Sequence, residues 1–316
     1  MAAPHITVIL CTLNRAVSLA ETLASLSRML ARSLHQAEIL LVDNGSTDAT
    51  STVLRDFAAT EPGVRLLREP RCGLSHARNL GLAHAETELI AFVDDDVDFE
   101  AGWLDAVVDG FHQQPETDVL GGRTDPRFPG PRPDWFYDRL ITWYGCSRLG
   151  EHSRWMRPQE FPYGVNMAFR REVLLASGGF ATDLGRRGTN LLSNDETELC
   201  RRLKAEGRRF WYCAEARLHH RIAPERLSPA WVLERHYWQG ISDVIMERRL
   251  RAAGAQSSRE PLGSLLTALL RANTGGRISL RHLWWHSRRQ SLPARAHRAY
   301  LWGRFVQTLK EALRRP

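Results

Sequence analysis

The sequence predicts an α/β fold in which helices flank a mostly parallel central sheet, followed by a helical, basic C-terminal extension. Two observations lead to this prediction. Short apolar runs alternate with segments of helical leucine spacing, and polar clusters follow the apolar runs directly. The 316 residues accommodate one α/β domain of about 200–250 residues plus an appendage. We therefore expect a main domain over residues 1–223 and an extension over residues 224–316.

The first hundred residues repeat one strand–loop–helix pattern. Residues 6–11 form an apolar, β-branched run, and after a polar break four leucines recur at helical spacing: Leu19, Leu23, Leu26 and Leu30. Further strands are expected at 39–42, 64–67 and 89–93, with helical segments between them. Such alternation implies parallel strands covered on both faces, with ligands beyond their carboxyl ends.

The rest of the chain is less regular. Residues 125–162 are rich in proline and aromatic residues, and we expect a loop region that lines a site. A strand at 163–169, a helix at 195–206 and a strand at 209–213 are predicted to follow. From about residue 224 the pattern is mostly helical.

Composition argues against a disordered or membrane-spanning protein. Hydrophobic residues make up 43% of the chain and charged residues 25%, and no apolar run approaches the roughly 18 residues of a spanning helix. The N-terminal apolar stretch has no basic region before it, so we expect a cytoplasmic protein. Five cysteines without CxxC spacing argue against a disulfide framework.

Charge is distributed unevenly. The formal net charge is +7, but residues 251–316 hold thirteen Arg and Lys against two acids, so this tail carries +11 and the remainder −4. A basic tail favours an anionic partner, either lipid headgroups or nucleic acid. Because the main domain is acidic, we expect no nucleic acid and favour peripheral contact with an anionic membrane at its inner face.

The most distinctive cluster is Asp94-Asp95-Asp96, which directly follows the strand at 89–93 and precedes Asp98. Four carboxylates so close together repel one another unless a cation neutralises them. Hard oxygen ligands of this kind suit Mg²⁺ or Mn²⁺ shared with substrate phosphates. The alternative is a solvated acidic turn, but the end of a strand is where an α/β fold places its ligand.

From about Ile6 to Ser242 the sequence resembles the inverting glycosyltransferases of family 2, which have the GT-A fold. The segment Val93–Val97 is similar to the DXD motif of that family. The resemblance implies that Asp94 and Asp95 lie near the ribose and diphosphate of a nucleotide-sugar donor. It also implies that Asp96 binds the metal cofactor, Mn²⁺ or Mg²⁺.

Three further segments carry the resemblance to the nucleotide site. Residues 11–15 match the first nucleotide loop, with Thr12, Asn14 and Arg15 as implied contacts. In the segment 42–48, Asp43 is implied to bind the nucleobase edge, although Asp-Asn-Gly is also a common turn sequence. In the segment 73–81, Arg78 is implied to face the nucleotide and could pair with phosphate, although a surface salt bridge is the alternative.

Two later segments resemble the catalytic part of the family. Ser193–Leu199 is similar to its acidic ED motif, whose second acid is the catalytic base, but the order here is Asp-Glu. Glu196 is therefore the expected base, with Asp195 in reserve. The alternative is a capping box, in which Ser193 and Glu196 cap a helix. His220, in the pair that follows the strand at 209–213, matches a metal-binding histidine, although surface histidines are common.

The resemblance implies inverting transfer of a sugar, with a UDP-sugar favoured, to a hydroxyl of a sugar or lipid-linked acceptor, in polysaccharide or glycoconjugate synthesis. Two rival functions compete with this one. A nucleotidyltransferase needs a basic, glycine-rich loop near its N-terminus, which this sequence lacks. A membrane- or nucleic-acid-binding protein would act through the basic tail, with Trp284, Trp285 and Trp302, and would have an inactive core.

Overall fold

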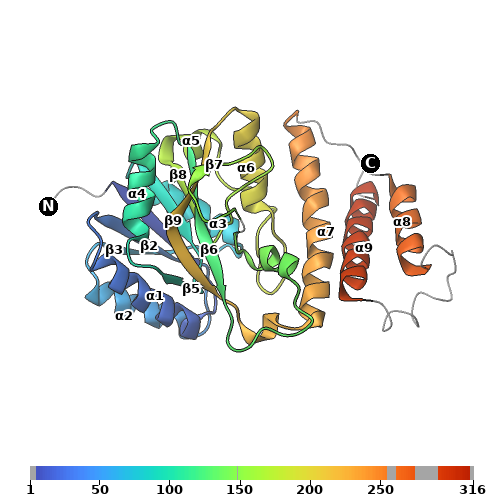
Figure 1. Ribbon diagram of the computed structural model, residues 1–316, viewed down its shortest axis with the longest axis horizontal. Helices are drawn as coiled ribbons and strands as arrows, with labels where there is room; N and C mark the ends of the chain where they lie inside the picture. Colours follow the sequence, from blue (N-terminus) through green and yellow to red (C-terminus); the bar gives the residue numbers. More distant parts are fainter. Residues whose placement is uncertain (1–4, 148, 255–260, 275–290, 314–316) are drawn as a thin grey trace. The chain divides into compact units, whose positions relative to one another are not determined.

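The computed structural model describes residues 5–147, 149–254, 261–274 and 291–313 (Figure 1). These residues form two compact units. The first unit, here the sheet unit, comprises residues up to 132, 136–182 and 195–222, and the second, the helical unit, comprises residues 133–135, 183–194 and 223 onwards. The predicted domain boundary between residues 223 and 224 is retained as a proposal.

The sheet unit is built on a nine-stranded sheet of order β3-β2-β1-β4-β8-β6-β9-β5, with β7 paired to β9. Its strands are β1 (Ile6–Thr12), β2 (Ala37–Asp43), β3 (Val64–Arg68), β4 (Leu89–Val93), β5 (Val97–Phe99), β6 (Val119–Arg127), β7 (Arg154–Trp155), β8 (Asn166–Arg170) and β9 (Phe210–Arg221). Strands β1 to β4 are parallel, as their βα alternation predicts, and β6 is parallel to β9. Strand β8 pairs antiparallel with β4 and β6, and β9 pairs antiparallel with β5 and β7.

Helices cover both faces of this sheet. They are α1 (Ala16–Leu30), α2 (Thr50–Thr60), α3 (Leu74–His84), α4 (Trp103–Gln113), α5 (Arg171–Ala176) and α6 (Asp195–Ala205), with the short helix η1 (Asp138–Tyr144) between β6 and β7. Side chains of β1 alternate between two apolar clusters. Val8 and Leu10 pack with α1 and α4, whereas Ile9 packs with α3, α5 and α6. Strand β1 is therefore buried on both faces, which explains why its sequence is apolar apart from Thr7 and the terminal Thr12.

Two predicted strands differ most from the observed ones. Strand β8 begins at Asn166 rather than at residue 163. Strand β9 extends to Arg221, so His219 and His220 lie within the strand and not after it. Leu218 and His220 are buried on this stretch while its other residues are more open, a period-2 pattern that the charged residues conceal in the sequence.

The helical unit contains α7 (Pro229–Ala252), α8 (Leu262–Thr274) and α9 (Leu292–Leu313), with η2 (Pro224–Arg226) before them. Helices α7 and α9 lie side by side (Figure 1). They approach at two glycines: a Cβ on Gly240 would lie 2.1 Å from the Tyr300 carbonyl oxygen, and one on Gly303 only 1.9 Å from that of Tyr237. Backbones this close leave no room for a side chain at either position.

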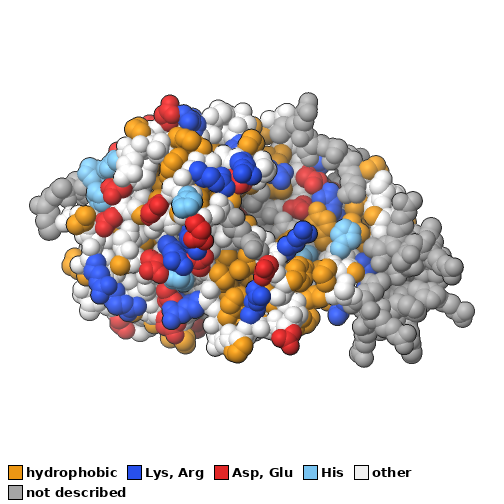
Figure 2. Space-filling view, viewed as in Figure 1, with side chains coloured by type: hydrophobic (Ala, Val, Ile, Leu, Met, Phe, Trp, Pro, Cys, Tyr) orange, Lys and Arg blue, Asp and Glu red, His pale blue; other side chains and the backbone are white. Residues whose placement is uncertain are grey.

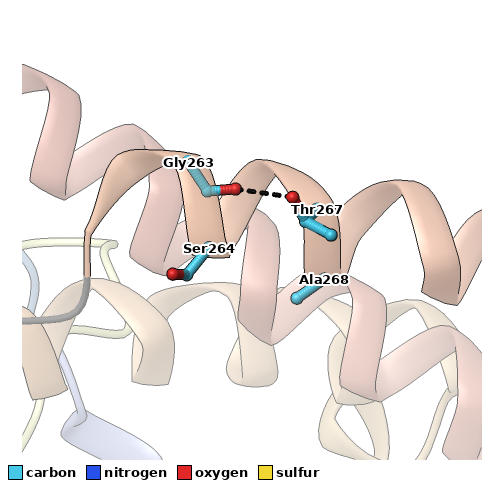
Figure 3. A pocket seen from close by; sticks show the side chains of 4 residues that line it. All are labelled: Gly263, Ser264, Thr267 and Ala268. Carbon is cyan, nitrogen blue, oxygen red and sulfur yellow. Dashed lines mark hydrogen bonds between the residues drawn. The ribbon is translucent and has the colours of Figure 1, made fainter.

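Helix α8 has a shallow hollow lined by small residues, Gly263, Ser264, Thr267 and Ala268 (Figure 3). The Thr267 hydroxyl donates a hydrogen bond to the Gly263 carbonyl at 2.8 Å, so it is used within the helix. The predicted pair Trp284-Trp285 lies outside the described residues. Within the described part of the chain, no helix combines the length and the apolarity that crossing a bilayer requires.

Candidate active site

The polar clusters predicted from the sequence gather at one edge of the sheet unit. In the parallel register, Thr12 at the end of β1 is opposite Asp43 at the end of β2, and Val93 at the end of β4 is opposite Leu10. The carboxyl ends of these three neighbouring strands, and the loops after them, therefore meet. This is the edge at which open α/β sheets bind ligands. Acidic and basic side chains lie close together on the visible surface of the sheet unit (Figure 2).

The loops after β1 and β2 are joined by hydrogen bonds. Asn14, in the left-handed region at φ 52°, accepts from the Thr47 backbone N–H at 2.8 Å and donates its own N–H to the Ser46 hydroxyl at 3.0 Å. One oxygen of Asp43 accepts from the Ser46 N–H at 2.8 Å, and the other accepts from the Ser51 hydroxyl. Asp43 thus binds the backbone of its own turn, which is the alternative considered for it. These hydrogen bonds hold the pKa of Asp43 below its ordinary value, although burial opposes them.

The acid triplet is held in place by β1 and α1. Thr12 donates its hydroxyl to Asp95 at 2.6 Å, and the Asp95 carbonyl accepts from Ser18 at 3.1 Å and Thr22 at 2.9 Å. Burial and the neighbouring Asp96 carboxylate raise the pKa of Asp95 to about 7. Asp95 and Asp96 are buried, whereas the Asp94 side chain is 35% exposed. The triplet therefore crowds negative charge at the end of a buried strand.

Asp98 does not contribute to this crowding. It forms ion pairs with Arg221 and, at 2.6 Å, with Arg127. The expectation that Asp98 shares a metal cation with the triplet is therefore wrong, because Arg221 and Arg127 pair with this carboxylate.

Asp96 faces His220. The two side chains are buried, and the Asp96 Oδ1 atom lies 3.0 Å from His220 Nε2. His220 reaches this place because it pairs in register with Val97, the residue after Asp96. Its Nδ1 lies 2.5 Å from the Tyr144 carbonyl oxygen, which directs Nε2 towards Asp96. Burial lowers the pKa of His220, but Asp96 and Cys146 together raise it to about 10.

This pair fits a divalent cation in part. A neutral imidazole oriented by a backbone carbonyl, beside a carboxylate, is a donor set that suits Mn²⁺, and a bound cation would take the place of the proton that Asp96 stabilises on His220. Within the described residues no group of three or more His, Cys, Asp or Glu side chains is placed to hold a metal. Asp96 and His220 would therefore hold the ion with substrate phosphate oxygens and water completing its coordination. Arg15, whose Nη2 is 3.8 Å from Asp96 Oδ2, brings a cation to the same carboxylate.

Arg78 is buried and bound to both acid motifs. Its Nη1 donates to Asp195 Oδ2 at 2.7 Å, and its Nη2 donates to the Gly164 carbonyl at 3.0 Å and to Asp94 Oδ1 at 3.3 Å. The surface salt bridge considered for this residue is therefore replaced by a buried one. Both terminal nitrogens of the guanidinium already have protein partners.

The second acid motif starts a helix. Helix α6 begins at Asp195, after Asn194 in the left-handed region at φ 71°, so Glu196 lies in its first turn. The Ser193 hydroxyl instead contacts Gln239 Oε1 at 3.2 Å, which does not support the capping box. Asp195 is buried with Arg78, whereas Glu196 is partly exposed. Burial and the Asp195 carboxylate raise the pKa of Glu196 to about 8, although Arg78 lowers it.

Several supporting residues are not predicted by the sequence. Tyr144 orients His220 through a backbone carbonyl, and Gly164 receives Arg78 in the same way. Because every residue has a backbone carbonyl, contacts of this kind cannot be predicted from residue type. Ser51, which binds Asp43, lies eight residues along the chain, and no motif distinguishes it from other serines.

This edge of the sheet brings together acids that could hold a divalent cation and a separate acid in the first turn of α6, an arrangement that fits a glycosyltransferase with a nucleotide-sugar donor. A family model described as Glycosyl transferase family 2 matches residues 7–177, more than half of the chain. The chain belongs to this family, as the sequence motifs predicted.

Similar proteins agree with this assignment. The Glucosyl-dolichyl phosphate glucuronosyltransferase of Haloferax volcanii is 29% identical over 247 residues, which cover 77% of each chain. Succinoglycan biosynthesis protein ExoM of Rhizobium meliloti is 26% identical over 245 residues, covering 75% of this chain and 73% of ExoM. Both alignments are longer than the stretch matched by the family model.

A solved structure matches the fold. The mannosyltransferase PcManGT from Pyrobaculum calidifontis, in complex with GDP-Man and Mn²⁺, has a TM-score of 0.62 and 21% sequence identity, covering 100% of this chain and 89% of that one. The predicted GT-A fold is confirmed. The protein is a glycosyltransferase with an α/β sheet flanked by helices.

Proposed function

We propose that the protein transfers a sugar, with inversion at the anomeric carbon, from a nucleoside diphosphate donor to an acceptor hydroxyl. One observation carries this proposal: Arg78 neutralises Asp195 in a buried pair, so the neighbouring Glu196 is the acid of the second motif that stays open to substrate. With its raised pKa, Glu196 suits a general base near neutral pH.

In the proposed step the Glu196 carboxylate takes the proton of the acceptor hydroxyl. The acceptor oxygen forms a bond to the anomeric carbon from the side opposite the diphosphate, and the bond to the diphosphate oxygen breaks with its electron pair. Thr12, Asn14, Arg15, Asp43, Asp94 and Asp95 would line the donor site. A divalent cation, Mn²⁺ or Mg²⁺, bound at Asp96 and His220 would supply Lewis-acid charge for the leaving diphosphate.

The donor is proposed to be a UDP-sugar. Each oxygen of Asp43 accepts one hydrogen bond and retains a second acceptor position, which suits the imide N–H of uracil. Guanine also carries such an N–H, and the mannosyltransferase with the matching fold holds GDP-Man. The choice between these bases therefore needs a direct comparison.

Donor hydrolysis and binding across a panel of UDP-, GDP-, ADP- and dTDP-sugars, with and without Mn²⁺, test this proposal. We expect Mn²⁺-dependent binding and slow hydrolysis of one UDP-sugar, and weaker binding of that donor by Asp43→Ala. Preference for a GDP-sugar would overturn the choice of base alone. No binding of any donor in either condition would overturn the proposed reaction.

The acceptor is proposed to be lipid-linked, in polysaccharide or glycoconjugate synthesis, at the cytoplasmic face of a membrane. The name of the Haloferax relative, a glucosyl-dolichyl phosphate glucuronosyltransferase, supports this class of acceptor. Helix α9 supports membrane contact. Trp302 and Leu313 are 51% and 77% exposed, Leu309 is 38% exposed, and the Phe305 ring stacks on Trp302 at 5.6 Å. Their spacing of three and four residues puts them on one face of a strongly basic segment.

Co-sedimentation with phosphatidylglycerol vesicles tests the membrane contact. We expect Trp302→Glu/Leu309→Glu to weaken vesicle binding at least about tenfold, because an apolar side chain of this size contributes about 1.5–3 kcal/mol when buried. Donor hydrolysis in solution should be unchanged. Leu34→Glu is the matched control, since Leu34 is 89% exposed in the sheet unit. This role of α9 is contradicted if both variants bind phosphatidylglycerol vesicles equally. It is also contradicted if the unchanged protein binds neutral phosphatidylcholine vesicles as well as it binds phosphatidylglycerol vesicles.

A further inference from the structure

Arg78 occupies a site built from four separate segments of the sheet unit. The guanidinium comes from α3, and its partners are Asp94 after β4, the Gly164 carbonyl before β8 and Asp195 at the start of α6. The side chains of Arg78 and Asp195 are each only 4% exposed. An arginine this buried is stabilised only where its charge and its donors are matched, as they are here.

Packing fixes the guanidinium further. The Phe180 ring lies against it, with the ring centroid 5.4 Å from the Arg78 Cζ atom. On another side, a Cβ added to Gly164 would lie 2.8 Å from Nη2 and 3.1 Å from Nη1. The absence of a side chain at Gly164 therefore makes the room that the guanidinium occupies.

We infer that Arg78 is a positioning residue that joins the two acid motifs: by holding Asp195 and the Gly164 carbonyl, it fixes the first turn of α6, and with it Glu196, relative to Asp94 of the donor motif. This inference rests on the proposed role of Glu196 as the base. Arg78 would then have a positioning role besides the nucleotide contact predicted from the sequence. This role follows from its two terminal nitrogens, which both bind partners within the protein.

The charges around Glu196 make this role of Arg78 testable through the pH dependence of kcat. Within the described part of the chain, the titratable and charged groups found to interact with Glu196 are Asp195 and Cys200 of α6, Arg78 of α3 and Tyr163 before β8. The positive charge of Arg78 lowers the pKa of Glu196, and the negative charge of Asp195 raises it. Removing either partner of the buried pair should therefore shift the pH dependence of kcat, in opposite directions.

Two variants that each remove one charge test this pH dependence. Because a base acts when deprotonated, Arg78→Gln should move the acidic limb of the kcat profile to higher pH, and Asp195→Asn should move it to lower pH, by roughly one pH unit each. Both variants should lower kcat more than they raise the donor KM. A general loss of packing would not give shifts of opposite sign.

Gly164→Ala is a milder perturbation that leaves every charge in place. The new methyl group should displace the guanidinium and lower kcat by up to about a hundredfold, with donor KM nearly unchanged. Gly130→Ala is its control, since a Cβ at Gly130 meets nothing within 4 Å. This variant keeps the inference testable if Arg78→Gln does not fold.

Specific outcomes would overturn the inference. If Arg78→Gln leaves the acidic limb in place and only weakens donor binding, Arg78 is a donor ligand and not a positioning residue. If Gly164→Ala behaves like Gly130→Ala, the position of the guanidinium does not affect turnover, and the inference also fails. Turnover retained in Glu196→Gln would instead overturn the proposed base, which separates failure of the proposed function from failure of this inference.

Discussion

Glu196→Gln is expected to lower kcat for sugar transfer by about 10²–10⁴-fold and to leave donor binding nearly unchanged. The amide keeps the shape of the carboxylate but cannot take the acceptor proton. Glu196 lies in the first turn of α6 and not in the acid triplet that follows β4, so the donor site should survive the change. Initial transfer rates, together with calorimetric titration of the donor product UDP and Mn²⁺, measure the two effects separately.

A matched control is Glu206→Gln, because Glu206 directly follows α6 and its side chain is 48% exposed. It should transfer sugar at the rate of the unchanged protein.

The wild-type kcat should rise with pH through the pKa of Glu196, near 8, and level off above it, since only the deprotonated acid is a base. The assignment of the base is wrong if Glu196→Gln loses donor binding instead of turnover.

Asp96→Asn and His220→Gln are each expected to weaken Mn²⁺-dependent donor binding by at least about 10–100-fold, the range that follows even from changes to residues that only orient metal ligands. The first change removes a charged oxygen ligand, and the second removes an imidazole that Tyr144 holds in orientation. Mn²⁺ paramagnetic resonance with and without UDP measures metal binding directly, independently of turnover.

The neighbouring histidine provides the control. His219 pairs with Glu100 rather than with Asp96, and its side chain is 28% exposed. His219→Gln should therefore bind Mn²⁺ and donor as the unchanged protein does. If it weakens metal binding as much as His220→Gln, or if neither histidine matters, then Asp96 and His220 do not form the metal site.

Sequence patterns predict the parallel half of the sheet well, because each βα unit there is a local pattern. Strands β1 and β4 are buried on both faces, and their sequences are apolar apart from two threonines of β1, so a short window identifies them. Strand β9 is longer than its sequence predicts. Its second half is defined by pairing with β5 and β6, which are distant in sequence, and its charged side chains hide the alternation.

In the candidate site, too, local features can be predicted from the sequence, whereas contacts between distant segments cannot. Acid clusters at strand ends are visible in the sequence, and so is the family they resemble. Partners are not visible: Arg78 meets Asp195 from 117 residues away, and Asp98 meets Arg221 from 123 residues away. Residue type alone therefore indicates a phosphate contact for Arg78 and a fourth metal-site acid in Asp98, and only the tertiary fold supplies their partners within the protein.

Strand β9 determines when the sheet can be completed during synthesis of the chain. It is the last strand of the sheet to leave the ribosome, and β5, β6 and β7 all pair with it. Until it is added, β6 has an open edge and Asp96 lacks the histidine beside it. A nascent chain that ends before residue 210 would thus hold the loops proposed to bind the donor without the proposed metal pair, and any activity that needs this pair would be acquired only near the end of the sheet unit's synthesis.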